Sequence, residues 1–264
     1  MSSNKLVVRK VAVLGAGVMG AQIAAHLANA KVATVLFDLP AKEGPKNAIV
    51  EKALAALKKQ KPAPLASKTA IQYIQAANYD DDLALLGECD LVIEAVAERL
   101  DIKENLYSKV APHLGAQTIF DTNTSGLSIE TLASVFSQEL KDRFCGVHFF
   151  NPPRYMHLVE LIACKETDAS VLDNLERFLV STLGKGVVRA KDTPNFVANR
   201  IGVFSMLATM ANAEKYDLRF DVVDDLTGAR LGRPQSATFR TADAVGLDTF
   251  AHVATTMHDN LHAD

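Results

Sequence analysis

Three glycines near the amino terminus have the spacing of a phosphate-binding turn. Gly15, Gly17 and Gly20 follow the short apolar run Val11–Leu14 and precede an alanine-rich helical stretch. The first glycine permits a tight strand-to-helix turn, the second lets the backbone approach a pyrophosphate, and the third lets the helix pack close to the strand. The amino terminus of the helix presents free N–H groups and a partial positive charge to the phosphates. The spacing therefore predicts a dinucleotide site.

An aspartate in the expected place extends this prediction. Asp38 ends the next apolar run, about 20 residues beyond the turn, where a carboxylate can accept hydrogen bonds from the adenosine ribose hydroxyls. A carboxylate also repels a 2′-phosphate, and no arginine follows Asp38 closely, so the sequence favours NAD over NADP. Glycines alone would be weak evidence, because they occur in loops everywhere. The strand before them, the helix after them and the acid at the next strand end supply the required context.

A histidine and a glutamate in later apolar runs are the candidates for proton transfer. His148 ends one run, and its side chain changes charge near neutral pH. Glu160 lies within another run, where a carboxylate is costly unless it is paired. A carboxylate bonded to the second ring nitrogen of His148 would fix its tautomer and stabilise the imidazolium. A histidine at a strand end is more often structural, so the catalytic interpretation depends on Glu160 and a neighbouring nicotinamide.

The elements that must position these residues alternate along the chain from Val11 to about Ala190. Predicted strands are Val11–Leu14, Thr34–Phe37, Leu91–Ala95, Thr118–Asp121, Phe144–Phe149, Leu158–Ala163 and Gly186–Arg189. Predicted helices are Met19–Asn29, Ala48–Lys59, Ile102–His113, Ile129–Phe136 and Ala169–Thr182. This alternation indicates an α/β fold, a Rossmann-like doubly wound sheet that is mainly parallel and has helices on both faces. Ligands bind such sheets beyond the carboxyl ends of the strands.

The pattern changes near residue 191. Thr193 is expected to cap a helix that has Pro194 at its first position, and no clear strands follow. Helices are predicted over residues 196–215, 222–229 and 241–258. We therefore predict an NAD-binding Rossmann domain over residues 1–190 and a small helical domain over residues 191–264, which we expect to be incomplete.

Composition excludes several classes of partner. The chain has 264 residues, of which 48% are hydrophobic and 22% charged, as is ordinary for a globular enzyme. The net charge of −3 gives no basic field that would recruit nucleic acid or an anionic membrane. No apolar stretch approaches the roughly 20 residues of a membrane span, and the first five residues contain no signal segment. We expect a cytoplasmic protein.

The three cysteines give no sign of a metal site. Cys89, Cys145 and Cys164 are far apart, lie in apolar runs and lack the spacing of metal ligands. Buried free thiols in a reducing compartment are the expectation.

Seven motifs follow one another along the chain. They are Gly15-x-Gly17-x-x-Gly20, Glu94-Ala-Val-Ala-Glu98-x-x-x-x-Lys103, Asn123-Thr-Ser125-x-x-x-Ile129, His148-Phe-Phe-Asn151-Pro-Pro, Leu158-Val-Glu160-Leu-Ile, Asp192-Thr-Pro-x-Phe196-x-x-Asn199-Arg200 and Ala242-Asp-x-Val-Gly-Leu-Asp248. In this order they resemble the 3-hydroxyacyl-CoA dehydrogenases of fatty-acid β-oxidation, and the resemblance runs from Val11 to about Phe250. It implies NAD-dependent oxidation of an (S)-3-hydroxyacyl-CoA to the 3-oxoacyl-CoA.

The resemblance also implies roles at matching positions. His148 would take the proton of the 3-hydroxyl group and Glu160 would hold the imidazole, while Ser125 and Asn199 would hydrogen-bond the reacting oxygen. NAD would be bound by Gly15, Gly17, Val18, Met19, Gly20, Asp38, Val96, Ala97, Glu98, Lys103, Ser125 and Asn151. Lys59 belongs to a basic tract, with Lys52, Lys58 and Lys61, that would contact the phosphates of coenzyme A. A solvated helix face explains that tract equally well.

The carboxyl-terminal part departs from the family pattern. Single-function members run somewhat longer than this chain, which ends soon after Asp248. We therefore expect the dehydrogenase part of a longer multifunctional protein, with an acyl-CoA as substrate and with a second copy or further domains as partners. Two alternatives stay open. One is a short-chain 3-hydroxybutyryl-CoA dehydrogenase working in the reductive, biosynthetic direction, and the other is an NAD-binding fragment without activity.

Overall fold

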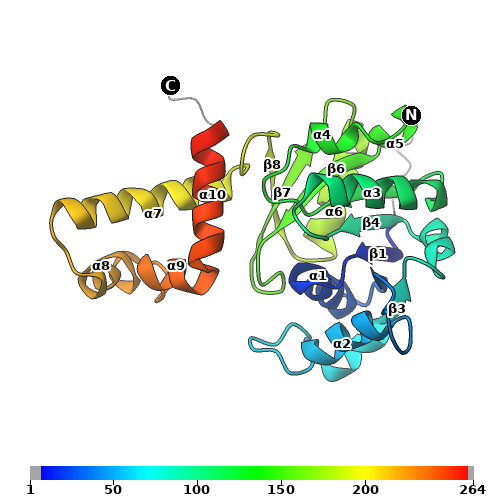
Figure 1. Cartoon of the computed structure of the whole chain (residues 1–264), viewed down its shortest axis with the longest axis horizontal. Coiled ribbons are helices and arrows are strands. Elements are labelled where there is room, and N and C mark those ends of the chain that lie inside the picture. Colours follow the sequence, from blue (N-terminus) through cyan, green and yellow to red (C-terminus); the bar gives the residue numbers. More distant parts are fainter. Residues whose placement is uncertain (1–6, 261–264) are drawn as a thin grey trace. The chain divides into compact units, whose positions relative to one another are not determined.

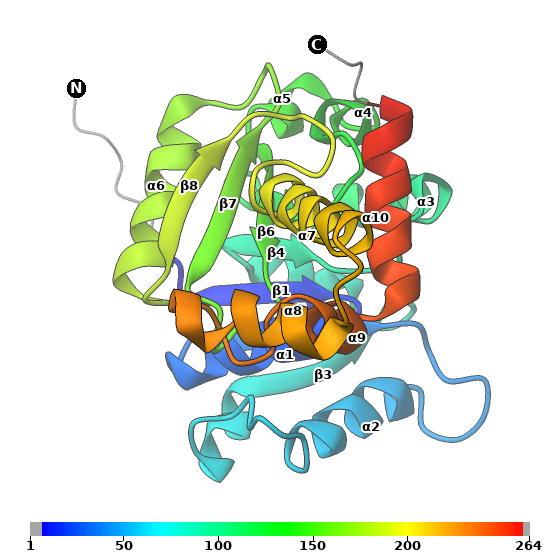
Figure 2. The same ribbon diagram turned by 90° about the vertical axis from the view of Figure 1, so that its left-hand side faces the viewer.

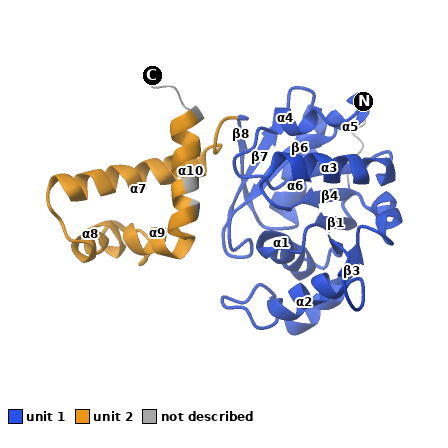
Figure 3. Cartoon of the chain, viewed as in Figure 1, with its two compact units in different colours: residues 1–192 blue, residues 193–264 orange. Residues whose placement is uncertain are grey.

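A computed structural model describes residues 7–260 of the chain. Residues 1–6, on which the expectation of a missing signal segment rests, lie outside this range, as do residues 261–264. The chain divides into two compact units, residues 1–192 and 193–264 (Figure 3), and each is described by itself. No helix of the described part is long and apolar enough to cross a membrane.

The first unit is built on one sheet (Figure 1). Within the described residues its strands are β1 (Lys10–Leu14), β2 (Ala33–Asp38), β3 (Ile74–Asn78), β4 (Leu91–Glu94), β5 (Ile119–Thr122), β6 (Phe144–Phe149), β7 (Leu158–Ala163) and β8 (Gly186–Ala190). Their spatial order is β3-β2-β1-β4-β5-β6-β7-β8, and all neighbours are parallel except β6 and β7. The order reverses direction at β1, as in a doubly wound sheet. The predicted fold class is confirmed, although the sequence pattern predicts no strand at β3.

Helices cover both faces of this sheet. The unit contains α1 (Val18–Asn29), α2 (Ala48–Leu57), η1 (Lys68–Tyr73), η2 (Leu83–Glu88), α3 (Leu100–Val110), η3 (Ala111–His113), α4 (Ile129–Ala133), α5 (Gln138–Lys141) and α6 (Ala169–Ser181). Apolar residues of α1 and α6 share one core with one face of the sheet, and α6 runs beside β8 in Figure 2. Tyr107 of α3 packs on the other face, against Phe120, Phe136 and Phe144.

Side chains alternate between these two faces along each strand. Cys145, Val147 and Phe149 of β6 belong to the core under α1 and α6. Phe144 and His148 therefore lie on the opposite face, the one covered by α3. The same alternation places Glu94, Thr122 and Glu160 on the α3 face. Ile93, Ile119 and Leu161, each an odd number of positions away on the same strand, lie in the other core.

The second unit is helical. It contains α7 (Ala198–Lys215), α8 (Phe220–Thr227), η4 (Ala229–Leu231), α9 (Phe239–Val245) and α10 (Leu247–Asn260). The first helix begins at Ala198 rather than at Phe196, and Thr193 does not cap it, because Asn195 and Phe196 both have left-handed backbone angles (φ 58° and 51°). The helix predicted over residues 241–258 is interrupted at Gly246, where φ is 98°.

The three cysteines are buried and unpaired, as predicted. Burial raises the pKa of the Cys89 thiol to about 11. Cys164 lies beside Glu130 and Glu166, with one ligand atom of each within 4.8 Å of the others, a proximity that sequence spacing does not reveal. Glu130 also contacts the Lys165 ammonium at 3.7 Å.

A carboxyl group on the α1 and α6 face has no partner. Asp121 of β5 is paired in register with Ile93 and Cys145 and is 1% exposed. Neither of its carboxyl oxygens has a hydrogen-bond partner among the described residues. Burial, and then the charge of Glu94, raise the pKa of Asp121 well above its usual range. The native protein therefore keeps this group protonated.

This protonation predicts a pH-dependent stability. Above pH ~3.9 the unfolded chain loses the Asp121 proton while the native state keeps it, so the free energy of unfolding falls as pH rises toward the native pKa. We expect Asp121→Asn to remove that contribution, so that the variant loses less stability than the wild-type protein when pH rises from 5 to 6. Urea unfolding of both proteins at the two pH values measures it. Identical pH slopes would show that Asp121 is ionised in the native state.

Candidate active site

The glycine turn has the geometry that its sequence predicts. Gly15 has φ of 100°, and its N–H donates to the Phe37 carbonyl at 2.8 Å. A Cβ on Gly20 would lie 1.8 Å from the Gly15 carbonyl oxygen, so only glycine lets α1 start so close to β1. A Cβ on Gly17 would meet nothing within 4 Å. The amino terminus of α1 is thus open at the point where a phosphate would approach.

Asp38 closes the turn from β2. One carboxylate oxygen accepts from the Ala16 N–H at 2.6 Å and the other from the Leu39 N–H at 2.7 Å. Beside it lies a cleft of about 550 Å³. The cleft is lined by Gly15, Gly17, Asp38, Leu39, Tyr79, Ala95, Val96, Ala97, Ile102, Asn105, Leu106 and Lys109. A glycine-rich backbone, one carboxylate and an apolar wall are the groups and the shape that fit a dinucleotide.

Seven of these twelve lining residues were not predicted from the sequence. Ile102, Asn105, Leu106 and Lys109 lie on one face of α3, at the i, i+3, i+4 and i+7 spacing that marks a helix face. That spacing is the signal in the sequence by which these four residues could have been placed on one surface. Tyr79 directly follows β3, and its ring stacks on Phe37 at a centroid distance of 5.9 Å. Because β3 was not predicted, Tyr79 could not be placed at the same edge as Asp38.

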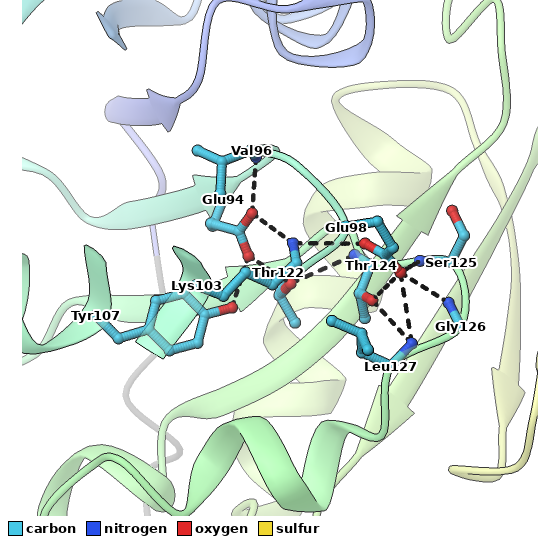
Figure 4. Close-up of polar contacts among 10 residues, drawn as sticks. All are labelled: Glu94, Val96, Glu98, Lys103, Tyr107, Thr122, Thr124, Ser125, Gly126 and Leu127. Atoms are coloured by element: carbon cyan, nitrogen blue, oxygen red, sulfur yellow. Dashed lines mark hydrogen bonds and ion pairs between the residues drawn. The ribbon is translucent and has the colours of Figure 1, made fainter. Parts of the chain in front are cut away.

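A buried carboxylate at the end of β4 organises the next part of the site (Figure 4). Glu94 is 0% exposed and accepts from the Lys103 ammonium at 2.6 Å, the Tyr107 hydroxyl at 2.6 Å and the Thr122 hydroxyl at 2.7 Å. It also accepts from the Val96 N–H at 2.7 Å. One side chain therefore joins α3, β5 and the loop that follows β4. Lys103, predicted to contact NAD, is 1% exposed and does not line the cleft.

A second glutamate ties the loop after β4 to the loop after β5 (Figure 4). One Glu98 oxygen accepts from the Thr124 hydroxyl, the Ser125 N–H at 2.8 Å and the Gly126 N–H at 3.0 Å. Its other oxygen lies 3.6 Å from the Lys103 ammonium. Burial raises the pKa of Glu98, but the Lys103 charge and these donors outweigh it and hold the pKa below its usual value. The Ser125 backbone is thereby fixed beside Glu98.

The predicted base and its carboxylate form a pair. His148 of β6 and Glu160 of β7 stand directly opposite each other in the antiparallel register, and His148 Nδ1 lies 2.8 Å from a Glu160 oxygen. Their exposed fractions are 3% and 0%. A carboxylate can only accept, so Nδ1 is the nitrogen that donates to Glu160. The Phe149 N–H next to the base donates to Asn123 Oδ1 at 2.9 Å.

The other predicted residues lie in several places. Asn151 follows β6 and accepts from the Gln22 side chain of α1 at 3.3 Å. Lys59 is exposed, two residues beyond the end of α2. Asn199 lies in the first turn of α7, in the second unit. Lys52, Lys58 and Lys61 are also exposed. The roles of these residues stay predictions.

The two units match the two parts of one protein family. Residues 10–193 match the family described as 3-hydroxyacyl-CoA dehydrogenase, NAD binding domain, and residues 196–264 match its C-terminal domain. The chain belongs to the 3-hydroxyacyl-CoA dehydrogenase family. Its first unit is the NAD-binding domain of that family, and NAD is the cofactor that the glycine turn and Asp38 predict.

Relatives extend over nearly the whole chain. A probable 3-hydroxyacyl-CoA dehydrogenase of Bacillus subtilis is 45% identical over 272 residues, which cover 97% of this chain and 34% of that protein. A probable 3-hydroxyacyl-CoA dehydrogenase of Deinococcus radiodurans is 45% identical over 249 residues, covering 94% of this chain and 72% of that one. The crystal structure of M. tuberculosis FadB2 has a TM-score of 0.84 at 30% identity and covers 96% of this chain and 88% of its own. The chain thus spans about a third of the Bacillus relative.

The Glu94 network predicts a large loss of stability when it is broken. Lys103→Met leaves a buried carboxylate without its cation, and we expect it to lower the free energy of unfolding by about 3–5 kcal/mol. The double variant Glu94→Gln, Lys103→Met should recover part of that loss, because the buried charge is gone. Chemical unfolding measures both.

Arg99→Met is the matched control for this prediction. It removes an ion pair with Asp101 next to the start of α3, in which both side chains are more than half exposed. An exposed pair contributes at most about 1 kcal/mol. Equal losses for Lys103→Met and Arg99→Met would contradict the assigned importance of Glu94.

Proposed function

We propose that this chain catalyses the NAD-dependent oxidation of (S)-3-hydroxyacyl-CoA thioesters to 3-oxoacyl-CoA, together with the reverse reduction. The observation that supports this most strongly is the buried pair of His148 and Glu160, 2.8 Å apart across β6 and β7. It occurs in a chain of this family whose first unit is an NAD-binding domain. The pair supplies the base that alcohol oxidation requires.

The proton step follows from the tautomer of the base. Glu160 accepts the Nδ1–H bond, so Nε2 of His148 is the basic nitrogen that takes the proton of the 3-hydroxyl group. As the imidazole becomes positively charged, the Glu160 carboxylate stabilises it across the same hydrogen bond. In the reverse direction the imidazolium returns the proton to the oxygen.

Electrons and atoms balance in this scheme. The C3–H bond breaks with its electron pair, the O–H bond breaks with its proton passing to His148, and the C3–O bond becomes a carbonyl. NAD, when bound, accepts the hydride. Ser125 and Asn199 are proposed to hydrogen-bond the reacting oxygen, which would orient it toward His148 and stabilise its developing charge. The hydrogen bond from the Ser125 N–H to Glu98 supports this role, because it fixes the backbone that carries the Ser125 hydroxyl group.

Binding of the two ligands is assigned to separate regions of the first unit. We propose that the open amino terminus of α1 takes the pyrophosphate of NAD and that Asp38 takes the adenosine ribose. Val96 and Ala97 of the cleft would contact the same molecule. The exposed Lys59 would contact a phosphate of coenzyme A. We place the reaction in fatty-acid β-oxidation, in the oxidative direction.

A substitution at the base tests the proposal. With acetoacetyl-CoA and NADH the wild-type chain should consume NADH, which is followed by absorbance. His148→Gln keeps a polar side chain of similar size but removes the base, so we expect turnover to fall by about 10²–10⁴-fold. NAD affinity, measured by calorimetry, should stay within about twofold, because His148 is not part of the turn that binds the phosphates.

His113→Gln provides the control, because His113 is exposed in η3. It should retain wild-type turnover. If His148→Gln also retains it, the base is misassigned. If the wild-type chain binds NAD but shows no turnover at all, the chain is a binding fragment and the proposed activity is wrong.

A further inference from the structure

The loop between β6 and β7 follows the base and carries Asn151, but it has few means of holding its own shape. Pro152 and Pro153 have no backbone N–H. The Tyr155 and Met156 N–H groups both donate back to the Pro152 carbonyl, which closes a turn within the loop. The Pro153 and Met156 carbonyls therefore need donors from elsewhere in the fold.

One buried lysine supplies those donors. Lys185 lies between α6 and β8 and is 4% exposed. Its ammonium donates to the Pro153 carbonyl and, at 2.9 Å, to the Met156 carbonyl. It also lies 5.9 Å from the ring centroid of Phe149, the residue next to the base. Burial lowers the pKa of Lys185 to about 8, so the charged form still predominates at pH 7.

The same turn is fastened to the helix predicted to bind phosphate. His26 Nε2 of α1 lies 3.2 Å from the Leu183 carbonyl, two residues before Lys185. Burial first, and then the charge of Lys185, lower the pKa of His26 to about 4, so its neutral ring donates from Nε2 to that carbonyl. Four residues earlier on the same helix face, Gln22 donates to the Asn151 side chain at 3.3 Å.

We propose that Lys185 is a positioning residue for the cofactor site: its ammonium fixes the proline-rich loop so that Asn151 meets the nicotinamide half of NAD. Lys185 acts through the loop, because its ammonium donates to two loop carbonyls. The inference rests on the proposed function, in that it takes Asn151 as a contact of NAD.

The choice of lysine has a physical reason. The two loop carbonyls cannot move apart without breaking their bonds to the ammonium. Such charge-assisted hydrogen bonds hold the carbonyls more firmly than bonds from neutral donors would. A second anchor holds the outer part of the loop, where the Arg154 guanidinium donates to the Ala63 and Leu65 carbonyls at 2.7 and 3.0 Å. Among the described residues, Lys185 alone donates to the Pro153 and Met156 carbonyls, which separates its effect from that of Arg154.

Lys185→Met tests the inference, because methionine keeps an unbranched apolar side chain but donates no hydrogen bond. We expect the Kd of NAD, measured by calorimetry, and the KM of NAD to rise about tenfold. The KM of acetoacetyl-CoA should change less than twofold. Loss of folded protein alone would lower kcat and leave both KM values unchanged, so this split distinguishes positioning from stability. Lys185→Arg, which keeps a charged donor, should recover part of the affinity.

Two comparisons complete the experiment. Lys191→Met removes an exposed lysine just beyond β8 and should leave NAD affinity unchanged. In an Asn151→Ala background, Lys185→Met should cause less than a twofold further loss, because two residues that act through one contact are not additive. A full additional tenfold loss, or wild-type NAD affinity in Lys185→Met itself, would overturn the inference. Calorimetry needs no turnover, so NAD affinity can be measured even in an inactive chain. An inactive wild-type chain would refute the proposed function and leave this test of Lys185 intact.

Discussion

The candidate site depends on one constraint: a carboxylate inside a sheet must be given hydrogen-bond donors. Glu94 and Glu160 are both 0% exposed within strands, and a buried charge without partners is prohibitively costly. Glu94 meets the requirement with donors from α3, from β5 and from the loop after β4. Glu160 meets it with the ring of His148 on the neighbouring strand. The bonds of the first acid hold Val96 in the wall of the cleft, and the bond of the second sets the nitrogen with which His148 donates.

The acids of the sheet and its loops show how donors decide the state of a carboxyl group. Glu98 keeps its charge and has a lowered pKa, because Lys103 and several N–H and O–H groups point at it. Asp121 lies on β5, the strand next to that of Glu94, but on the opposite face of the sheet, where its neighbours are apolar. Without donors its pKa rises, and it stays protonated. The Glu98 side chain is also 36% exposed, whereas Asp121 is 1% exposed, so donors and exposure together make the difference.

The sequence predicted those features that short-range patterns encode. Gly15, Gly17 and Gly20 could be recognised because a strand and a helix flank them, and the fold class follows from the alternation of apolar runs and helices. The pairing of His148 with Glu160 could be anticipated, because an acid in an apolar strand requires a partner. The register that joins them could not, because it depends on the antiparallel pairing of β6 with β7 in an otherwise parallel sheet.

Other features depend on contacts that no local pattern contains. The burial of Lys103 follows from its bond to Glu94, nine residues earlier, which no local pattern predicts; its contact with NAD stays a prediction. The left-handed backbone of Asn195 and Phe196 moved the start of α7, although Thr193 and Pro194 have the composition of a helix start. The strand β3 was missed because Ile74–Asn78 has one large apolar side chain, Ile74, beside two alanines. Its pairing with β2, which no local pattern contains, makes it a strand.

The loop after the base shows why long-range contacts carry so much of a site's geometry. Prolines stiffen a chain but remove the N–H groups with which it could bind its surroundings. The loop that carries Asn151 is therefore held by side chains from α1, from the turn before β8 and from Arg154 within the loop itself. Because Gln22 and His26 extend from the same helix that begins at the glycine turn, the two regions assigned to NAD share one support. If α1 moved, both regions would move with it. The distance between them would therefore stay constant, as a rigid dinucleotide site requires.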